Sequence, residues 1–155
     1  MASAPAPTRR TLIVANRTAS TPILLQEVER RAGEQPTAFV LLIPDVASRK
    51  AADWTLNEGL KSLRRAAQGP TGHRPAYVEG LVGGADPFES IQRALAEGDF
   101  DDVVISTLPK RSSQWLKRDL PARVEKLGVP VTVITPQKEK RMSLEESGIW
   151  GGGLQ

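Results

Sequence analysis

The 155-residue chain has no cysteine and only one histidine, His73. Without thiol groups it can form neither disulfide bonds nor thiolate-ligated metal centres. A single imidazole leaves little from which a histidine-based metal site could be built. The composition therefore predicts a protein without a metal centre, and the lack of cysteine fits the cytoplasm.

Long hydrophobic runs are also missing. No apolar stretch approaches the roughly 18 residues that a membrane-spanning helix needs. The first ten residues, MASAPAPTRR, lack the apolar segment of a secretory signal. We therefore expect a cytoplasmic protein with no membrane insertion.

The length and composition fit one globular domain, because 39% of the residues are hydrophobic and 25% are charged. Residues 1–8 are rich in alanine, proline and serine, and we interpret them as a disordered lead-in. Residues 137–155 turn polar and then glycine-rich, which is typical of a flexible C-terminal tail. The domain itself is predicted to span residues 9–136.

Positive charge is concentrated in one segment. Residues 109–126 contain six lysines and arginines against two carboxylates, an excess of four, whereas the whole chain has a net charge of +3. The whole-chain charge is too small to indicate a nucleic-acid partner. The local excess instead directs attention to this segment as a binding surface.

Short apolar segments alternate with amphipathic ones along the chain. Strands are predicted at residues 11–15, 37–43, 76–82, 102–107 and 131–134. Each of the first four is followed by apolar residues at the three- and four-residue spacing of a helix; the second of these helices is expected to begin near Asp53.

Turn and cap residues suggest where the helices begin and end. Thr21 is expected to cap the first helix and Gly33 to end it, and Asp86 is expected to cap the third. Pro121 either kinks the fourth helix or lies in its true first turn. We favour the second interpretation, with Asp119 or Leu120 at the cap.

The short apolar strands lack strict alternation, which is typical of strands buried on both faces. A repeated strand–helix order with right-handed crossovers predicts an α/β fold: a three-layer, doubly wound, five-stranded parallel sheet. Ligands of such sheets bind beyond the carboxyl ends of the strands, where the strand order reverses. The candidate loops are residues 16–21, 44–48 and 107–120.

Four segments resemble the universal stress protein family. They are residues 12–16 (LIVAN), 84–87 (GADP), 103–106 (VVIS) and 129–134 (VPVTVI), and the resemblance covers about residues 10–135. It implies the fold predicted above with the strand order 3-2-1-4-5, a fold shared with adenine nucleotide alpha hydrolase-like proteins. It also implies a binding site for ATP or another adenine nucleotide. It also implies a homodimer formed through the last strand, Val131 to Ile134.

The chain departs from the family at its glycine motif. ATP-binding members carry Gly-x-x-Gly, nine residues and then Gly-Ser or Gly-Thr after the fourth strand. Glycines of this kind let backbone amides approach phosphate at a helix N-terminus. Here Ser106 and Pro109 stand at the first two glycine positions, and Asp119 or Lys117 stands at the third. Pro109 has no amide hydrogen to donate, so the resemblance carries over the fold and argues against amide-cradled ATP.

The first strand departs from the family as well, because Asn16 stands where ATP-binding members have an aspartate. An asparagine can still hydrogen-bond a base or a sugar, but it lacks the carboxylate's charge. Basic and hydroxyl side chains after the fourth strand could hold an anion in place of the amides. The alternatives are a solvated basic helix face, and a helix cap that accounts for Ser20 and Thr21 without a ligand.

The predicted nucleotide- or anion-binding residues all lie in the three candidate loops, except Ser106, which directly precedes the third loop. They are Asn16, Arg17, Thr18, Asp45, Val46, Ser106, Thr107, Lys110, Arg111, Ser112, Ser113, Lys117 and Arg118.

Two further binding surfaces are considered. Ile149 and Trp150 are apolar residues in a glycine-rich tail, where they could anchor in a partner protein's groove or fold back on their own domain. The basic segment could bind nucleic acid or an acidic protein surface, although nucleic acid is less favoured because Trp115 alone is available there for stacking.

The sequence shows no nucleophile–base pair, no metal-ligand cluster and no paired carboxylates at a strand end, so no catalytic residue is predicted. The leading hypothesis is a non-enzymatic, stress-protein-like regulatory or binding domain with weak or lost ATP binding. The alternative is the basic interaction module.

Overall fold

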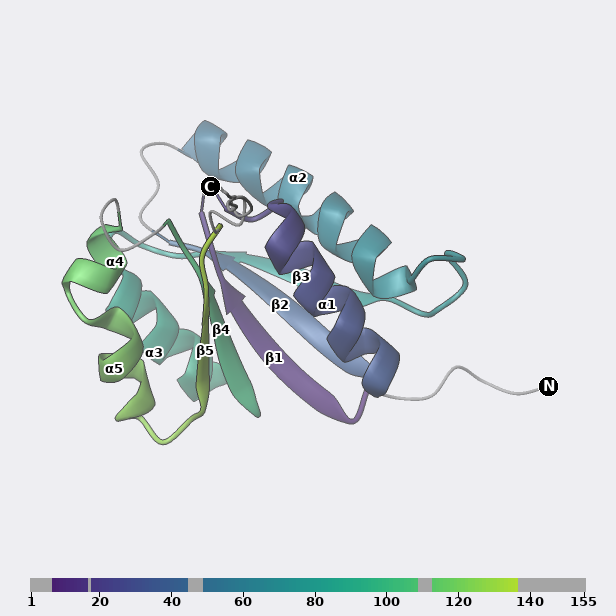
Figure 1. Ribbon diagram of the computed structural model, residues 1–155. Coiled ribbons are helices and arrows are strands. Elements are labelled where there is room, and N and C mark those ends of the chain that lie inside the picture. Colours follow the sequence, from purple (N-terminus) through teal and green to yellow (C-terminus); the bar gives the residue numbers. More distant parts are fainter. Residues whose placement is uncertain (1–6, 17, 45–48, 109–112, 137–155) are drawn as a thin grey trace, which may run out of the picture.

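The computed structural model describes residues 7–16, 18–44, 49–108 and 113–136, and for residues 49–52 it describes the backbone alone. Strands and helices alternate along the chain (Figure 1). They are β1 (Arg9–Val14), α1 (Pro22–Glu34), β2 (Thr37–Ile43), α2 (Arg49–Gln68), β3 (Tyr77–Val82), α3 (Pro87–Glu97), β4 (Asp102–Ser106), α4 (Gln114–Lys117), α5 (Leu120–Glu125) and β5 (Val131–Ile134).

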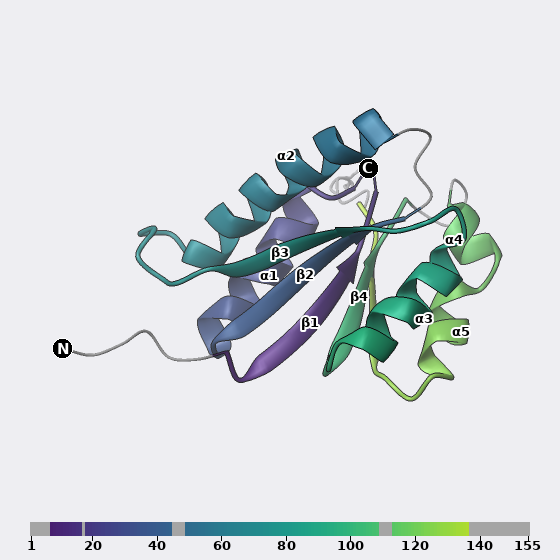
Figure 2. The same cartoon turned by 180° about the vertical axis from the view of Figure 1, so that it is seen from behind.

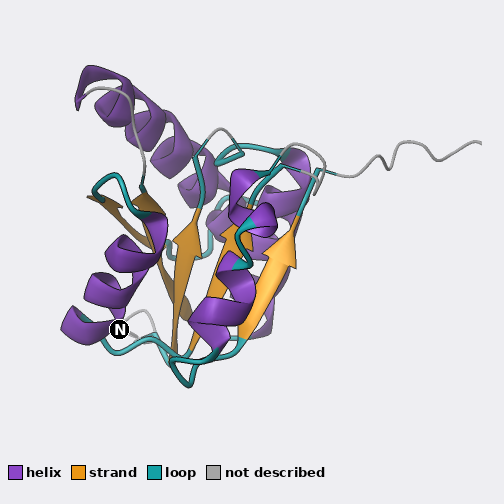
Figure 3. Cartoon of the chain, turned by 90° about the vertical axis from the view of Figure 1, so that its left-hand side faces the viewer, coloured by secondary structure: helices purple, strands orange, loops and turns teal. Residues whose placement is uncertain are grey.

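The five strands form one parallel sheet in the order β3-β2-β1-β4-β5. Helices α1 and α2 cover one face of the sheet and α3, α4 and α5 cover the other, as opposite views show (Figures 1 and 2). Figure 3 shows the sheet between these two helical layers. The predicted three-layer α/β fold and its strand order are therefore confirmed.

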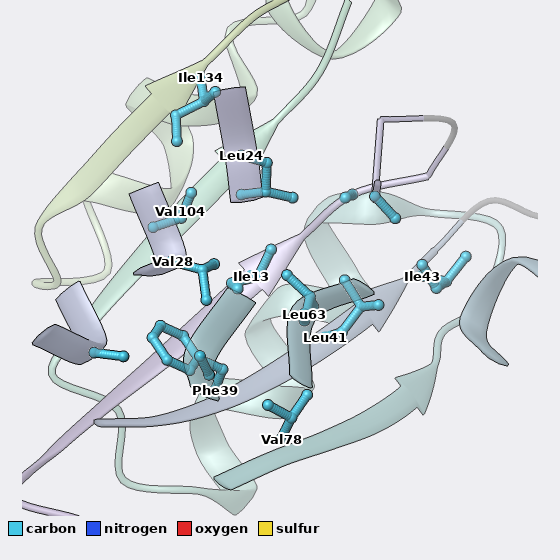
Figure 4. Packing of buried hydrophobic residues seen from close by; sticks show 14 residues of the cluster. Ile13, Leu24, Val28, Phe39, Leu41, Ile43, Leu63, Val78, Val104 and Ile134 are labelled. Atoms are coloured by element: carbon cyan, nitrogen blue, oxygen red, sulfur yellow. The ribbon is translucent and has the colours of Figure 1, made fainter. Parts of the chain in front are cut away.

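The continuous apolar run of β1 is explained by the two cores that it serves. Leu12 and Val14 belong to the buried cluster beneath α3 and α5, whereas Ile13 belongs to the cluster beneath α1 and α2. Successive strand residues point to opposite faces, so a strand covered on both sides needs apolar residues at every position. Figure 4 shows the second cluster, in which Ile13 packs with residues of both helices such as Leu24 and Leu63.

Two helix boundaries differ from the predicted ones. Helix α2 begins at Arg49, before the expected start near Asp53. Helix α1 continues past Gly33 to Glu34 and ends where Gln35 turns extended and donates its amide to the Arg31 carbonyl. The prediction that Gly33 ends the helix was wrong, because this end needs no positive φ; a Cβ on Gly33 would lie 3.4 Å from the Arg74 guanidinium.

The segment after β4 forms two short helices instead of the single predicted one. Asp119 adopts the left-handed conformation, with φ 55°, and separates α4 from α5. Pro121 lies in the first turn of α5, which confirms the favoured interpretation of this proline. No helix in the described part of the chain is long and apolar enough to cross a membrane.

Candidate functional site

The sheet reverses its strand order between β1 and β4, which lie side by side. The chain leaves β1 toward α1 on one face and leaves β4 toward α4 on the other (Figure 1). The carboxyl edge of these two strands is therefore the place where a doubly wound sheet binds ligands. Several of the predicted site residues lie here.

Thr18 and Ser106 form a reciprocal pair across this edge. The Thr18 hydroxyl donates to the main-chain oxygen of Ser106 at 2.8 Å, and the Ser106 hydroxyl donates to Thr18 Oγ1 at 2.8 Å. Thr18 is 3% exposed and Ser106 is 0% exposed. The pair ties the β1–α1 loop to the end of β4, so both hydroxyls are directed at the protein itself.

Thr107 and Ser113 form a second hydroxyl pair, with 2.7 Å between the two side-chain oxygens. Both residues are buried. Ser113 Oγ also accepts the amide of Leu116 at 3.1 Å, so Ser113 caps α4. The Thr107 amide donates to the Ile134 carbonyl, which joins this loop to the end of β5.

Asn16 lies half-buried at the end of β1. Its side-chain amide donates to the main-chain oxygen of Pro44 at 3.0 Å and so bridges the ends of β1 and β2. Its main-chain oxygen accepts the amide of Ala19. Asn16 therefore holds the ends of these two strands together at the candidate site.

Thr21 occupies the cap position of α1, but its side chain makes no capping hydrogen bond. The Thr21 hydroxyl donates to the Thr18 carbonyl at 3.0 Å instead. The expectation that this hydroxyl caps the helix was therefore wrong. The hydroxyl instead forms a hydrogen bond within the β1–α1 loop. Pro22, at the first helical position, has no amide hydrogen that needs a partner.

Lys117 and Arg118 are exposed at the end of α4. The Lys117 main-chain amide donates to the main-chain oxygen of Ser113, but neither side chain has a described hydrogen bond to the hydroxyl pairs. The remaining predicted residues lie outside the described part of the chain. They are Arg17, Asp45, Val46, Lys110, Arg111, Ser112, Ile149 and Trp150.

An ionic cluster that the sequence did not reveal lies at the amino ends of β1 and β4, opposite to the candidate site. The carboxylate of Asp102, the first residue of β4, pairs with Arg31 of α1 and with Arg9 of β1, and accepts the Thr11 hydroxyl at 2.7 Å. Arg31 also pairs with Glu27 at 2.6 Å. An aspartate at the start of a buried strand was the available signal, but its partners lie far away in the sequence.

Electrostatics in this cluster favour the ionised carboxylates. Burial raises the pKa of Asp102, but hydrogen bonds from Arg31 and Thr11, together with the charges of Arg31 and Arg9, outweigh burial and hold that pKa below its usual range. Burial likewise raises the pKa of Glu27, and hydrogen bonds from Arg30 and Arg31 and their charges lower it overall. The cluster is thus a structural tie between α1 and the sheet.

The described polar groups of the candidate site are hydroxyls and amides. Among the described residues, no group of three or more histidine, aspartate or glutamate side chains is placed to hold a metal ion. The described hydroxyls at the β1–β4 edge have hydroxyl or main-chain partners and no adjacent carboxylate or imidazole base among their hydrogen bonds.

Comparison with solved structures identifies the architecture. A universal stress protein from Archaeoglobus fulgidus superposes with a TM-score of 0.58 at 16% sequence identity, over 83% of this chain and 95% of that one. The chain has the universal stress protein fold. A universal stress protein crystallised in complex with cAMP matches with a TM-score of 0.49 at 16% identity, over 83% of this chain and 98% of that one. No protein-family model and no curated protein matches the sequence.

Proposed function

We propose that the protein is a non-enzymatic binding domain with the universal stress protein fold, in which affinity for adenine nucleotides is weak or lost. The observation that carries this proposal is the reciprocal hydrogen bonding of Thr18 and Ser106 across the β1–β4 edge. The universal stress protein fold supports it, since the sheet's ligand edge is where this pair lies.

The hydroxyl pair and the missing glycines both disfavour the binding of phosphate. Ser106 stands at the first glycine position of the family's motif, and its side chain is used to hold the β1–α1 loop. A phosphate that contacted either hydroxyl would have to break a buried pair, which costs about 1–3 kcal/mol if a group is left unsatisfied. Pro109, at the second glycine position, cannot donate an amide.

Calorimetric titration of the purified full-length chain with MgATP, AMP and cAMP tests the proposal. We expect no saturable binding tighter than about 1 mM, no nucleotide released on denaturation, and no ATP hydrolysis above the buffer rate. A stoichiometric adenine nucleotide in the denatured sample, or hydrolysis that falls in Asn16→Ala, would contradict it.

A pair of double variants separates glycine's backbone freedom from simple loss of side chains. Ser106→Gly with Pro109→Gly restores two glycines of the motif, and we expect it to raise the affinity for ATP at least tenfold. Ser106→Ala with Pro109→Ala removes the same side chains and restores an amide at position 109 without glycine freedom. Equal gains in the two double variants would show that glycine itself is not the missing element.

We also propose that the protein forms a homodimer through β5. This strand is at one edge of the sheet, and Val133 is 40% exposed there. Val131 and Val133 line a cavity of about 400 Å³ beside Pro121 and Ala122 of α5. An unpaired edge strand with an apolar side chain favours pairing with another strand.

The alternative function is binding of nucleic acid or of an acidic protein surface, and it would use Lys110, Arg111, Lys117, Arg118 and Arg123. Of these, Lys117, Arg118 and Arg123 lie in the described part of the chain and are exposed. Its signature is affinity that falls steeply as salt rises, because each neutralised phosphate releases counterions. Saturable binding with a flat salt dependence would exclude it.

A further inference from the structure

A cavity of about 270 Å³ lies between the first turn of α3 and the α4–α5 segment. The two segments belong to the same helical layer of the fold (Figure 2). The cavity is separate from the hydroxyl pairs, because none of Thr18, Ser106, Thr107 and Ser113 lines it. Its lining includes Asp86, Phe88, Trp115, Arg118, Leu120 and Arg123.

The apolar part of the lining is anchored in the protein core. Phe88 and Trp115 are partly buried and pack against the cluster that contains Ile91, Leu120 and Val124. Leu120 itself is buried. Aromatic side chains held in this way provide fixed apolar surface that suits a planar ring, with little entropy to lose on binding.

Two arginines lie at the same cavity, and both are exposed. The Arg123 guanidinium carbon is 4.3 Å from the centroid of the Phe88 ring, so its position is set by a cation–π contact. In the part of the chain that the structure describes, neither Arg118 nor Arg123 has an ion-pair partner, whereas Arg9 and Arg31 are both paired with Asp102.

The carboxylate of Asp86 also lines the cavity, but it is already engaged. Asp86 Oδ1 accepts the amides of Phe88 at 3.0 Å and Glu89 at 3.3 Å, so it caps α3. The positive end of the helix partly offsets its charge. The lining thus holds two arginines without carboxylate partners against one carboxylate that is satisfied within the protein, which favours an anion.

We propose that this cavity binds a small aromatic carboxylate. The ring would pack on Phe88 and Trp115, and the carboxylate would accept charge-assisted hydrogen bonds from Arg118 and Arg123. A cavity of about 270 Å³ is at or below the lower end of the range for drug-sized ligands, so a single ring with one acidic group fits better than a nucleotide.

Titration of the ¹⁵N-labelled full-length chain with benzoate tests the proposal. We expect saturable shifts at the Trp115 indole and at the amides of Phe88 and Leu120, with a Kd on the order of 1 mM or tighter. The double variant Arg118→Gln with Arg123→Gln should raise the Kd of benzoate at least tenfold. Trp115→Phe assigns the indole signal.

Two controls distinguish specific recognition of benzoate at the cavity from a general effect of charge on its binding. Arg93→Gln removes an exposed arginine from α3 that does not line the cavity, and it should leave the benzoate Kd within twofold. Benzamide keeps the ring and lacks the charge, so it should bind at least tenfold more weakly. The proposal is overturned if benzamide equals benzoate, if Arg93→Gln matches the double variant, or if benzoate gives no saturable shifts at the cavity. Shifts confined to residues near Thr18 and Ser106 would overturn it too, and would locate the ligand at the β1–β4 edge.

Discussion

Arg31, in the last turn of α1, forms an ion pair with Asp102, the first residue of β4. The two side chains are 11% and 5% exposed. They join α1 to the central sheet at the amino end of β4, opposite to the candidate site. Because both side chains are largely buried, removal of either takes a close counter-charge from its partner: Arg31 would keep only Glu27, and Asp102 would keep only Arg9.

Asp102→Asn is expected to lower the free energy of unfolding by about 2 kcal/mol, since Arg31 then loses its more deeply buried counter-charge and keeps only Glu27. Urea unfolding followed by circular dichroism measures this. Glu34→Gln is the matched control, because it removes a carboxylate that pairs with Arg30 at the surface. Equal losses of stability in the two variants would contradict a special role for the buried pair.

The same cluster predicts how stability depends on pH. Asp102 and Glu27 have a lower pKa in the folded chain than in the unfolded one, so their ionised forms stabilise the fold above the unfolded pKa of about 4. That contribution is lost as the pH falls from about 4 through the folded pKa values. The free energy of unfolding measured between pH 7 and pH 2.5 should fall less steeply in Asp102→Asn than in the natural chain. Parallel profiles would count against the cluster as the source of acid sensitivity.

The hydroxyl pair at the other edge is expected to show energetic coupling. Thr18→Val and Ser106→Ala should each cost about 1–2 kcal/mol of stability, because each leaves a buried polar group without its partner. In the double variant the loss should be smaller than the sum by about 1 kcal/mol, as expected for groups in contact. Ser20→Ala, at an exposed hydroxyl of the same loop, is the control and should have little effect. Strict additivity would show that the two hydroxyls act independently.

The proposed dimer can be tested at Val133. Val133→Lys places a charge on the exposed edge strand and should yield a monomer in light scattering, with the fold intact by circular dichroism. Leu81→Lys is a matched control, because Leu81 is 43% exposed on β3 at the opposite edge of the same sheet. A monomeric natural chain, or dissociation by Leu81→Lys alone, would contradict pairing through β5.

The strands were the part of the fold most readily predicted. The ranges 37–43 and 131–134 agree with β2 and β5, since a short apolar run between turn-forming residues is a local signal. Helix ends were less certain. Gly33 has the residue type of a helix end but lies inside α1, because this helix ends at an extended Gln35 and needs no residue with positive φ.

That these polar residues gather at the carboxyl ends of β1 and β4 was predictable from the sequence, but their arrangement was not. Thr18, Ser106, Thr107 and Ser113 were predicted as ligand-binding residues because they follow β1 and β4. The structure brings them together as two hydrogen-bonded pairs, and whether they also contact a ligand stays a prediction. No local pattern marks Thr18 as the partner of a residue 88 positions away.

The sequence alone determined the alternation of strands and helices and the burial of the sheet on both faces, because hydrophobic periodicity is a property of neighbouring residues. Its resemblance to a known family supplied the strand order. Only the tertiary structure decided which polar groups meet: Thr18 with Ser106, Arg31 with Asp102, and Arg123 with the Phe88 ring. Hydrogen bonds and ion pairs depend on distances of a few ångströms between segments remote in the chain, and those distances exist only once the layers have packed.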